Sequence, residues 1–377
     1  MTDERTPPTR RDTLRYGGAV TAGLGLAGCS DVADQSATPT GTGAYSATIE
    51  PVGTVEFDSV PETWLAMTAG WADMGIALGQ DPPAGLTTTS RYHTHHYEDI
   101  PGVSVDRSDI LQLYDAGIDK ELFYEQNVDL HVFDPNFLTN RVENLGRADI
   151  DELAEKVAPF FGNTVFSRNY GWHDGYRYYT MYEAFEKLAD VFQEQARYEA
   201  FASLHEAVRT DLQNRLPPVD DCPSVATVMV VSEEPEVFYP FRIEQGTGWK
   251  QWRDLGVSDA FEESDVETFT AARASIGYEK LLDVDPDYLM LYGYESLSAT
   301  EFQQTFLSFF EDHDVASELT AVQNGNVHRA GGFYQGPIIN LSLTERAASQ
   351  LYADEFGGEQ LYDRERVADI VTGTFDR

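Results

Sequence analysis

The sequence has few basic residues and very few lysines. Its 377 residues contain 64 aspartates and glutamates against 26 lysines and arginines, and only five of the basic residues are lysines. A protein that binds nucleic acid needs a basic surface for the phosphates, so this composition excludes that class. The acidic residues are spread along the chain. This pattern is typical of a surface adapted to very high salt, where screening weakens self-repulsion.

Cysteine and long hydrophobic runs are also scarce. Two cysteines, Cys29 and Cys222, cannot form a disulfide framework or a thiolate metal site. No stretch has the roughly 20 consecutive apolar residues that a membrane-spanning helix needs. The glycines do not have the spacing of a Walker loop or a dinucleotide fingerprint, and no nucleophile elbow is present. We therefore expect a binding protein and not an enzyme.

The first 29 residues have the features of a secretion leader. Arg10-Arg11 precede a short, weakly apolar run from Gly17 to Leu26, and Leu26-Ala27-Gly28-Cys29 follows. A charged region before a short apolar run is typical of a signal peptide, and paired arginines indicate the twin-arginine route. The last four residues resemble a lipobox, whose cysteine becomes the lipidated first residue. We therefore expect Cys29 to anchor the protein to the outer face of the cell membrane.

One long helical stretch, residues 176–216, divides the rest of the chain. Its apolar residues recur at helical spacing with one slip near Gln195, and Pro217 ends it. The slip predicts a shorter helix followed by a span of about 20 residues, roughly 30 Å long. We expect this helix to be a strut between an N-terminal lobe, 45–175, and a C-terminal lobe, 217–377. An ordinary crossover helix within one large domain is the alternative.

Both lobes alternate strands with helices, which predicts an α/β fold with mostly parallel sheets. A Ser-, Thr- and Gly-rich segment, residues 30–44, precedes them and is expected to be a flexible tether. The strands are expected at Trp64–Met67, Val128–Phe133, Thr164–Phe166, Ser224–Val231, Tyr288–Leu291 and Asn326–Arg329. A helix is expected at Trp71–Leu78 in the first lobe and another at Ile338–Tyr352, closing the second.

Two segments, one in each lobe, share the same spacing of a glutamate and an aspartate. Glu121 stands eight residues before Asp129, and Glu279 stands eight residues before Asp287. In both segments the aspartate opens a hydrophobic strand. Carboxylates are common in this chain, so coincidence is the alternative to two related lobes.

Several further segments complete a pattern that covers nearly all of the chain after the tether. They are Trp64–Gly79, both Glu-to-Asp segments, Asp285-Pro286-Asp287, Leu255-Gly256, Ala321–His328 and Gly336-Pro337. In these segments the sequence resembles the substrate-binding proteins of ABC importers that take up iron-siderophores, haem and cobalamin. The resemblance implies two Rossmann-like lobes joined by a single long backbone helix, with a ligand in the cleft between them. It also implies a monomer that works with an ABC permease and ATPase.

Loops that follow predicted strands are where such a fold binds its ligand. Arginine offers a fixed fork for an anionic chelate, and aromatic residues offer its walls. We expect an iron(III)-siderophore-type ligand, with haem or cobalamin as alternatives. The expected contacts are Arg91, Tyr92 and Trp172 from the first lobe and Tyr239, Arg242 and Tyr334 from the second.

A group of histidines suggests a metal site as one of two interpretations. His93, His95 and His96 stand beside Glu98, and neutral imidazoles bind zinc and iron well. An exposed polar loop has the same composition, so no metal site is assigned. His93, His95 and His173 remain candidate metal ligands. If the bound molecule were haem, His93 or His173 would be the iron ligand. A chelatase-like or hydrolytic enzyme using His93 and Glu98 is the weaker alternative function.

The paired glutamates are the expected contacts with the permease. By the resemblance, Glu121 and Glu279 would each lie on the outer face of one lobe and meet basic residues of a permease dimer. The alternative is two ordinary carboxylates at helix starts, where the helix dipole favours negative charge.

We predict that Cys29→Ser releases the mature protein from the membrane. Lipid chains contribute about 0.8 kcal/mol per buried CH₂, so a chain that carries none should be recovered in the soluble fraction. Cell fractionation and mass spectrometry of the N-terminus measure this. A Cys29→Ser protein that stays as membrane-bound as the wild type would show that the anchor lies elsewhere.

Overall fold

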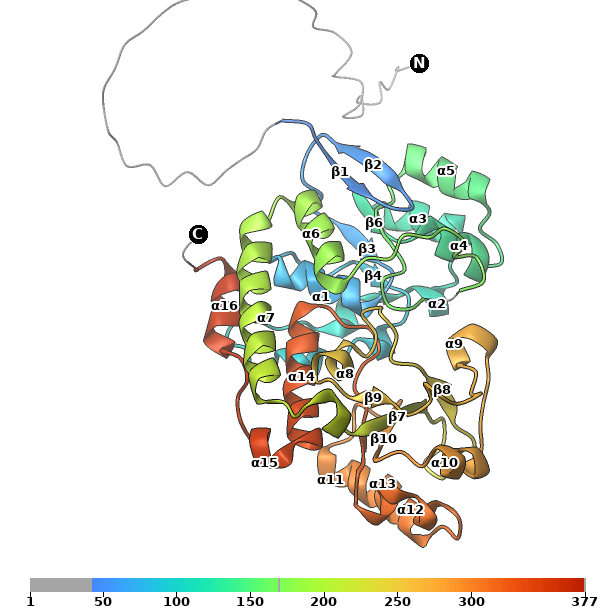
Figure 1. Ribbon diagram of the computed structural model, residues 1–377. Coiled ribbons are helices and arrows are strands. Elements are labelled where there is room, and N and C mark those ends of the chain that lie inside the picture. The colour runs from blue at the N-terminus through green and yellow to red at the C-terminus, as the bar shows by residue number, and fades with distance from the viewer. Residues whose placement is uncertain (1–42, 169, 376–377) are drawn as a thin grey trace, which may run out of the picture. The chain divides into compact units, whose positions relative to one another are not determined.

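A computed structural model describes residues 43–375 except Asn169, and it contains two separate sheets with helices around them (Figure 1). The first sheet has the order β5-β4-β3-β6, and all its strand pairs are parallel. The second has the order β11-β10-β7-β8 with β9 beside β7, and only β8 is antiparallel to its neighbour. A hairpin of β1 and β2 precedes both. The strands are β1 Tyr45–Ile49, β2 Gly53–Phe57, β3 Trp64–Ala66, β4 Gly85–Leu86, β5 Leu111–Gln112, β6 Leu130–Val132, β7 Ser224–Met229, β8 Tyr239–Phe241, β9 Ser258–Asp259, β10 Tyr288–Tyr292 and β11 Val327–Arg329.

Helices follow most of the strands, as the predicted α/β fold requires. Those of the first lobe are α1 Ala69–Ala77, α2 Leu113–Ala116, α3 Lys120–Gln126, α4 Pro135–Arg141 and α5 Arg147–Lys156. The connection between the lobes contains α6 Met181–Phe192 and α7 Gln195–Arg215. Those that follow are α8 Lys250–Asp254, α9 Phe269–Ala272, α10 Tyr278–Val284, α11 Ala299–Phe302, α12 Ser308–Asp312, α13 Thr320–Gln323, α14 Pro337–Leu351, α15 Ala353–Phe356 and α16 Arg364–Thr372.

The expected strut is two helices that meet at a sharp break. A capping box of Thr180 and Glu183 starts α6, so the helical region begins at Met181 and not at residue 176. Gln193, with φ of 57°, ends α6 in the left-handed conformation. The 21-residue α7 then runs to Arg215 and stops before the two prolines, as predicted. It packs against α1 of the first lobe and α8 of the second.

The closing helix α14 belongs to both lobes. It packs on α1 as well as on α8, and ten of its residues are buried. All nine residues of α1 are buried too, because α1 is covered by α14 and α16 in addition to its own sheet. A helix without a polar face is stable only when it is enclosed in this way. The hydrophobic core of the first lobe is therefore continuous with α7 and α14, while a second core lies on the outer side of β7 and β10.

The segment Thr164–Phe166 was predicted as a strand, and this is wrong. Thr164 donates its hydroxyl to Asp134 at 2.6 Å. The next two carbonyl groups, of Val165 and Phe166, accept from the amides of Thr247 at 2.7 Å and Gly248 at 3.3 Å in the second lobe. The segment is as apolar as a strand because it is buried, but its backbone hydrogen bonds join the lobes instead of extending a sheet.

The two Glu-to-Asp segments have the same local structure. Glu121 and Glu279 lie in the first turns of α3 and α10, and each helix ends at a residue with φ of 40–45°. The aspartate that follows binds the start of the neighbouring strand. Asp129 accepts from the amide of Thr63, and Asp287 accepts from the amide of Ser224. The spacing in the sequence therefore reflects one structural unit used once in each lobe.

The predicted leader cannot be compared with the structure, because Cys29 and the twin arginines lie outside the described residues. Within residues 43–375, no helix is long and apolar enough to cross a membrane.

The buried imidazole of His131 predicts acid sensitivity of the fold. His131 lies in β6 between the rings of Phe123 and Phe160, and burial lowers its pKa to about 3. Between pH 6.5 and about 3, His131 is protonated in the unfolded chain but not in the folded chain, so the free energy of unfolding falls as the pH falls. We expect this residue to contribute a slope of about 1.4 kcal/mol per pH unit in that window.

Urea unfolding at several pH values, at constant ionic strength, measures this slope. His131→Leu removes the titrating ring and keeps an apolar side chain, so its free energy of unfolding should depend less on pH below 6.5. Above pH 7 the two proteins should show the same pH dependence. Equal slopes for both proteins in the acid range would contradict the assignment.

Candidate ligand-binding site

A cleft with a volume of about 450 Å³ lies between the two lobes. Its walls are built from residues that stand at the carboxyl ends of parallel strands. Thr68 follows β3, Thr87 follows β4, and Tyr292 is the last residue of β10. In open α/β sheets this is the edge at which ligands bind, since helices cover the faces. The volume lies within the range of small-molecule sites.

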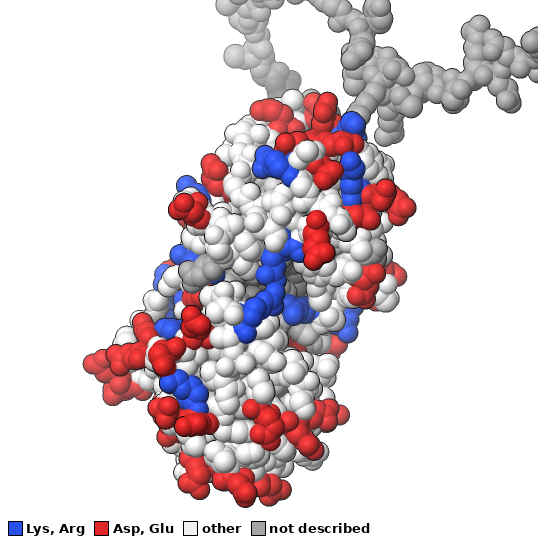
Figure 2. All heavy atoms as spheres, turned by 90° about the vertical axis from the view of Figure 1, so that its right-hand side faces the viewer, with Lys and Arg blue, Asp and Glu red and all other residues white. Residues whose placement is uncertain are grey.

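The charged residues of the cleft are all basic. Arg91 and Arg141 come from the first lobe and Arg273 from the second, and no carboxylate lines the cleft within the part of the chain that the structure describes. Figure 2 shows basic side chains gathered at a hollow in the middle of this face, with acidic side chains towards both ends. In a chain with 64 carboxylates, this concentration of arginine makes the cleft a site for negative charge.

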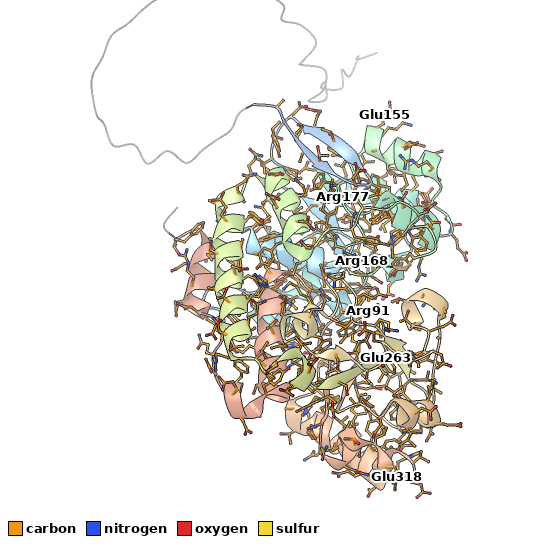
Figure 3. The ribbon with its side chains drawn as sticks, in the orientation of Figure 1. Arg91, Glu155, Arg168, Arg177, Glu263 and Glu318 are labelled. Carbon is orange, nitrogen blue, oxygen red and sulfur yellow. The ribbon has the colours of Figure 1, made fainter. Side chains whose placement is uncertain are left out.

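Each of the three arginines lies over an aromatic ring, and the pairs are Arg91 with Tyr334, Arg141 with Tyr170, and Arg273 with Phe269. The guanidinium carbons lie 5.8, 5.9 and 5.0 Å from the respective ring centroids. Arg91 also donates to the hydroxyl of Tyr334 at 3.2 Å, and this hydrogen bond joins the two lobes. Figure 3 shows Arg91 in the middle of the molecule. None of the three forms an ion pair with a carboxylate in residues 43–375. Their charge is therefore not neutralised by the protein.

Phenol groups add neutral donors to this positive surface. Burial raises the pKa of Tyr170 and of Tyr292 far above the physiological range, so both hydroxyls stay protonated. A protonated phenol can donate a hydrogen bond to an anionic oxygen. The cleft thus combines charged and neutral donors with flat aromatic walls.

The family described as periplasmic binding protein matches this chain over residues 70–332. The chain belongs to that family. The match includes most of the cleft residues, Arg91, Arg141 and Arg273 among them, and the whole of α7, and it confirms the resemblance found in the sequence. No protein in the collection of curated sequences matches the chain.

Solved structures of periplasmic binding proteins share the fold. One from Veillonella parvula has 15% identity and a TM-score of 0.57, over 82% of this chain and 98% of its own. Helicobacter pylori CeuE, solved with Ni(II) bound, has 12% identity and a TM-score of 0.59, over 88% and 97%. A Bacillus subtilis component of a ferrichrome ABC transporter has 18% identity and a TM-score of 0.53, over 79% and 97%. At these identities the likeness concerns the fold alone.

Two of the residues predicted from the sequence of this periplasmic binding protein lie in the cleft. Arg91 and Tyr334 line it, and they are hydrogen-bonded to each other from opposite lobes. Tyr334 follows β11, which lies at the predicted strand Asn326–Arg329, while Arg91 follows β4, a two-residue strand that the sequence did not predict.

Tyr92 and Trp172 do not line the cleft, which corrects their assignment as ligand contacts. Tyr92 is fully buried, and its hydroxyl lies 2.8 Å from that of Tyr97, which in turn donates to Asp73. Arg91 is the last residue of the short 3-10 helix Thr89–Arg91 and lines the cleft, while Tyr92, which caps that helix, is buried in the core. Trp172 stacks on Tyr170 at 4.5 Å and supports that ring without lining the cleft.

Tyr239 and Arg242 are also placed outside the cleft. Tyr239 packs edge-on against Phe269, which is itself a wall residue. Arg242 donates to the carboxylate of Asp259 at 2.7 Å and lines a separate, more acidic hollow. The positive charge of Arg242 is therefore paired with a neighbouring carboxylate and does not face the cleft.

The candidate histidines lie elsewhere as well. His173 stacks on Tyr176 with ring centroids 4.1 Å apart, and burial lowers its pKa. His93 and His95 lie close together, with ring centroids 6.0 Å apart, and His95 approaches Glu295 of the second lobe at 3.5 Å. No histidine lines the cleft among the described residues. Glu121 and Glu279 are exposed on the helices α3 and α10.

Several cleft residues were missed. Arg141, Arg273, Tyr170 and Tyr292 line the cleft but were not among the expected ligand contacts. Tyr292 directly follows the predicted strand Tyr288–Leu291, so the strand-end rule could have found it. Arg141 lies at the far end of α4, seven residues after its Asp134 cap, and nothing in the sequence shows that this helix turns its last residue towards the cleft.

Proposed function

We propose that this periplasmic binding protein captures an anionic iron(III)-siderophore-type chelate outside the cytoplasm and delivers it to an ABC permease and ATPase. The single observation that supports this proposal is a cleft lined by three arginines and, among the described residues, by no carboxylate. Charge-assisted hydrogen bonds from arginine to a carboxylate or catecholate oxygen suit such a ligand. The ferrichrome transporter component of B. subtilis, with its similar fold, supports the same class of ligand.

The Cys29 anchor belongs to this proposal. Tethering through residues 30–44 would keep the two lobes near the membrane that holds the permease. The family supports a location outside the cytoplasm, while the lipid rests on the leader sequence.

Haem and cobalamin are the alternative ligands, and the arrangement of the histidines disfavours haem. A haem iron takes an axial ligand such as histidine or tyrosine. His93 and His173 lie outside the cleft, and burial raises the pKa of Tyr170 and of Tyr292 on its walls, which keeps these two hydroxyls protonated. A ferric chelate brings its own iron ligands, so it needs only the arginines and the aromatic walls.

We predict that Arg141→Gln and Arg273→Gln each weaken binding of an anionic ferric siderophore by roughly 10- to 150-fold. One charge-assisted hydrogen bond contributes about 1.5–3 kcal/mol, and 1.4 kcal/mol corresponds to a factor of ten. Neither arginine has an ion-pair partner among the described residues, so the substitution leaves no buried carboxylate unpaired. Titration with ferric siderophores and with haemin, followed by tyrosine and tryptophan fluorescence at high salt, measures the affinities.

Arg242→Gln is the matched control. It removes the same charge from the second lobe but from outside the cleft, so it should lower stability through Asp259 and leave affinity unchanged. The cleft would be the wrong site if Arg242→Gln lost affinity while the other two variants bound normally. If haemin bound tightly and no siderophore bound, the proposed ligand class would be wrong, but the cleft would remain the binding site.

The exposed glutamates support delivery to a permease. Glu121 and Glu279 occupy equivalent positions in the two lobes, on helices that follow the same Glu-to-Asp pattern. Two matched carboxylates on one molecule fit a partner with two matched basic surfaces, such as a dimeric permease.

We predict that Glu121→Ala combined with Glu279→Ala impairs uptake in cells while leaving ligand affinity intact. Both side chains are exposed, so folding should not change by more than about 0.5 kcal/mol. Uptake of the radiolabelled ferric chelate measures the first effect and fluorescence titration the second. Glu125 and Glu318, exposed on the same two lobes, give a control pair that should transport normally. Unchanged uptake by the double variant would refute the contact.

A further inference from the structure

Two histidines of the first lobe meet a buried carboxylate of the second. His95 Nε2 lies 3.5 Å from Glu295 Oε1, and His96 Nε2 lies 3.9 Å from the same oxygen. One ligand atom from each of the three residues falls within 4.8 Å of the others. Within the described residues no other group of three such side chains is gathered so closely. None of the three lines the cleft.

The position of these residues follows from the fold. His95 and His96 lie in the short 3-10 helix Thr94–Tyr97, on the loop that carries Arg91. Glu295 lies three residues beyond the end of β10, after Gly293. Gly293 has φ of 129°, and a Cβ there would lie 2.9 Å from the carbonyl oxygen of Val230. Only glycine allows the chain to turn Glu295 towards the histidines.

His96 carries a ring nitrogen that has no partner within residues 43–375. The residue is 6% exposed, its Nδ1 lies 2.8 Å from the hydroxyl of Ser342, and its Nε2 has no hydrogen bond to any described residue. If the ring proton is on Nδ1, the lone pair of Nε2 faces a carboxylate oxygen of Glu295. If the proton is on Nε2, the distance of 3.9 Å from Nε2 to Glu295 Oε1 is too long for a hydrogen bond. A buried polar atom in this position requires a further partner. A cation between the nitrogen and the carboxylate would supply it.

We propose that His95, His96 and Glu295 bind one divalent transition-metal ion of the Zn²⁺, Co²⁺ or Ni²⁺ class. Two imidazoles and a carboxylate form a donor set that such ions accept, with water in the remaining position. Ligand atoms around a tetrahedral Zn²⁺ lie about 3.3 Å apart, so small side-chain rotations are enough to close the site. His95 is exposed and gives the ion a path of entry.

The surroundings hold the ligands in the state that binds a metal. Burial lowers the pKa of His96 well below its usual value and keeps the ring neutral. Burial alone would raise the pKa of Glu295, but Arg346 and His95 outweigh it and hold the carboxylate ionised. Ser342 fixes the His96 ring through Nδ1, which is how metal-binding histidines are usually oriented.

Arg346 is the feature that limits affinity. Its guanidinium bonds both oxygens of Glu295, so the carboxylate is already paired with one positive charge. A carboxylate has about four lone-pair sites and can accept from arginine while it binds a metal. We therefore expect a site weaker than one with a free carboxylate. The ion would link the loop of the first lobe to the end of β10 and would stabilise the contact between the lobes.

The test is titration of the full chain, without a histidine tag, with Zn²⁺ and with Co²⁺. Calorimetry should show one ion per chain, and Co²⁺ should give the visible absorption bands of a four-coordinate site. Zn²⁺ should raise the midpoint of thermal unfolding by several degrees, because it binds the folded state. His95→Gln should weaken binding by more than about 100-fold, since loss of an outer partner alone costs 10- to 100-fold.

Ser342→Ala, which removes only such an outer partner, should weaken binding by about tenfold. The control is His313→Gln, because His313 also lies beside a glutamate, at 3.4 Å from Glu236, but has no third ligand. It should bind the ion like the wild type. His95 is exposed, so its variant should fold even where a variant of His96 or Glu295 does not.

The proposal does not depend on the ligand of the cleft. His95→Gln should bind the ferric chelate as the wild type does, so failure of either proposal can be recognised separately. Absence of one-to-one binding by the wild type would overturn the metal site. So would equal affinities of the wild type and His95→Gln.

Discussion

The buried carboxylate of Asp73 connects the parts of this molecule on which binding depends. It lies in α1 of the first lobe and accepts hydrogen bonds from the first turn of α14, at 3.0 Å from the amide of Ile338. It also accepts from Tyr97, whose hydroxyl contacts that of Tyr92. Burial raises the pKa of Asp73 to about 7, and these hydrogen bonds oppose that shift. One carboxylate thus holds both the closing helix and the loop that places Arg91.

That loop brings the positive charge of Arg91 to the cleft, in a chain whose other charges are mostly negative. The formal net charge is −38, yet the lining of the cleft carries only arginines as charged groups among the described residues. The surrounding acid would slow the approach of an anion at low salt, and salt screens this repulsion over about 10 Å or less. Inside the cleft each arginine lies over an aromatic ring, and no carboxylate among the described residues lines the cleft beside them. Binding of an anion therefore relies on short contacts and not on the field of the whole protein.

Regular parts of the fold followed from local patterns. The strand at Tyr288–Leu291, the helix at Trp71–Leu78 and the break in the strut all lie within a few residues of their predicted places. The apolar segment Thr164–Phe166 was misassigned because burial alone does not distinguish a strand from a buried connection. Of the expected ligand contacts, Arg91 and Tyr334 line the cleft between the lobes. Tyr92 and Arg242 lie outside it because they pair with Tyr97 and Asp259, and these contacts depend on how the loops fold back.

The sequence by itself determined the α/β alternation, the matched Glu-to-Asp units of the two lobes and the predicted leader, because spacing along the chain carries that information. Tertiary structure alone decided which arginines remain unpaired. It also placed His95 and His96 beside Glu295, about 200 residues away in the chain. Such contacts depend on packing between lobes, where a change of one residue in register reverses the direction of a side chain. No local pattern encodes that direction for a loop.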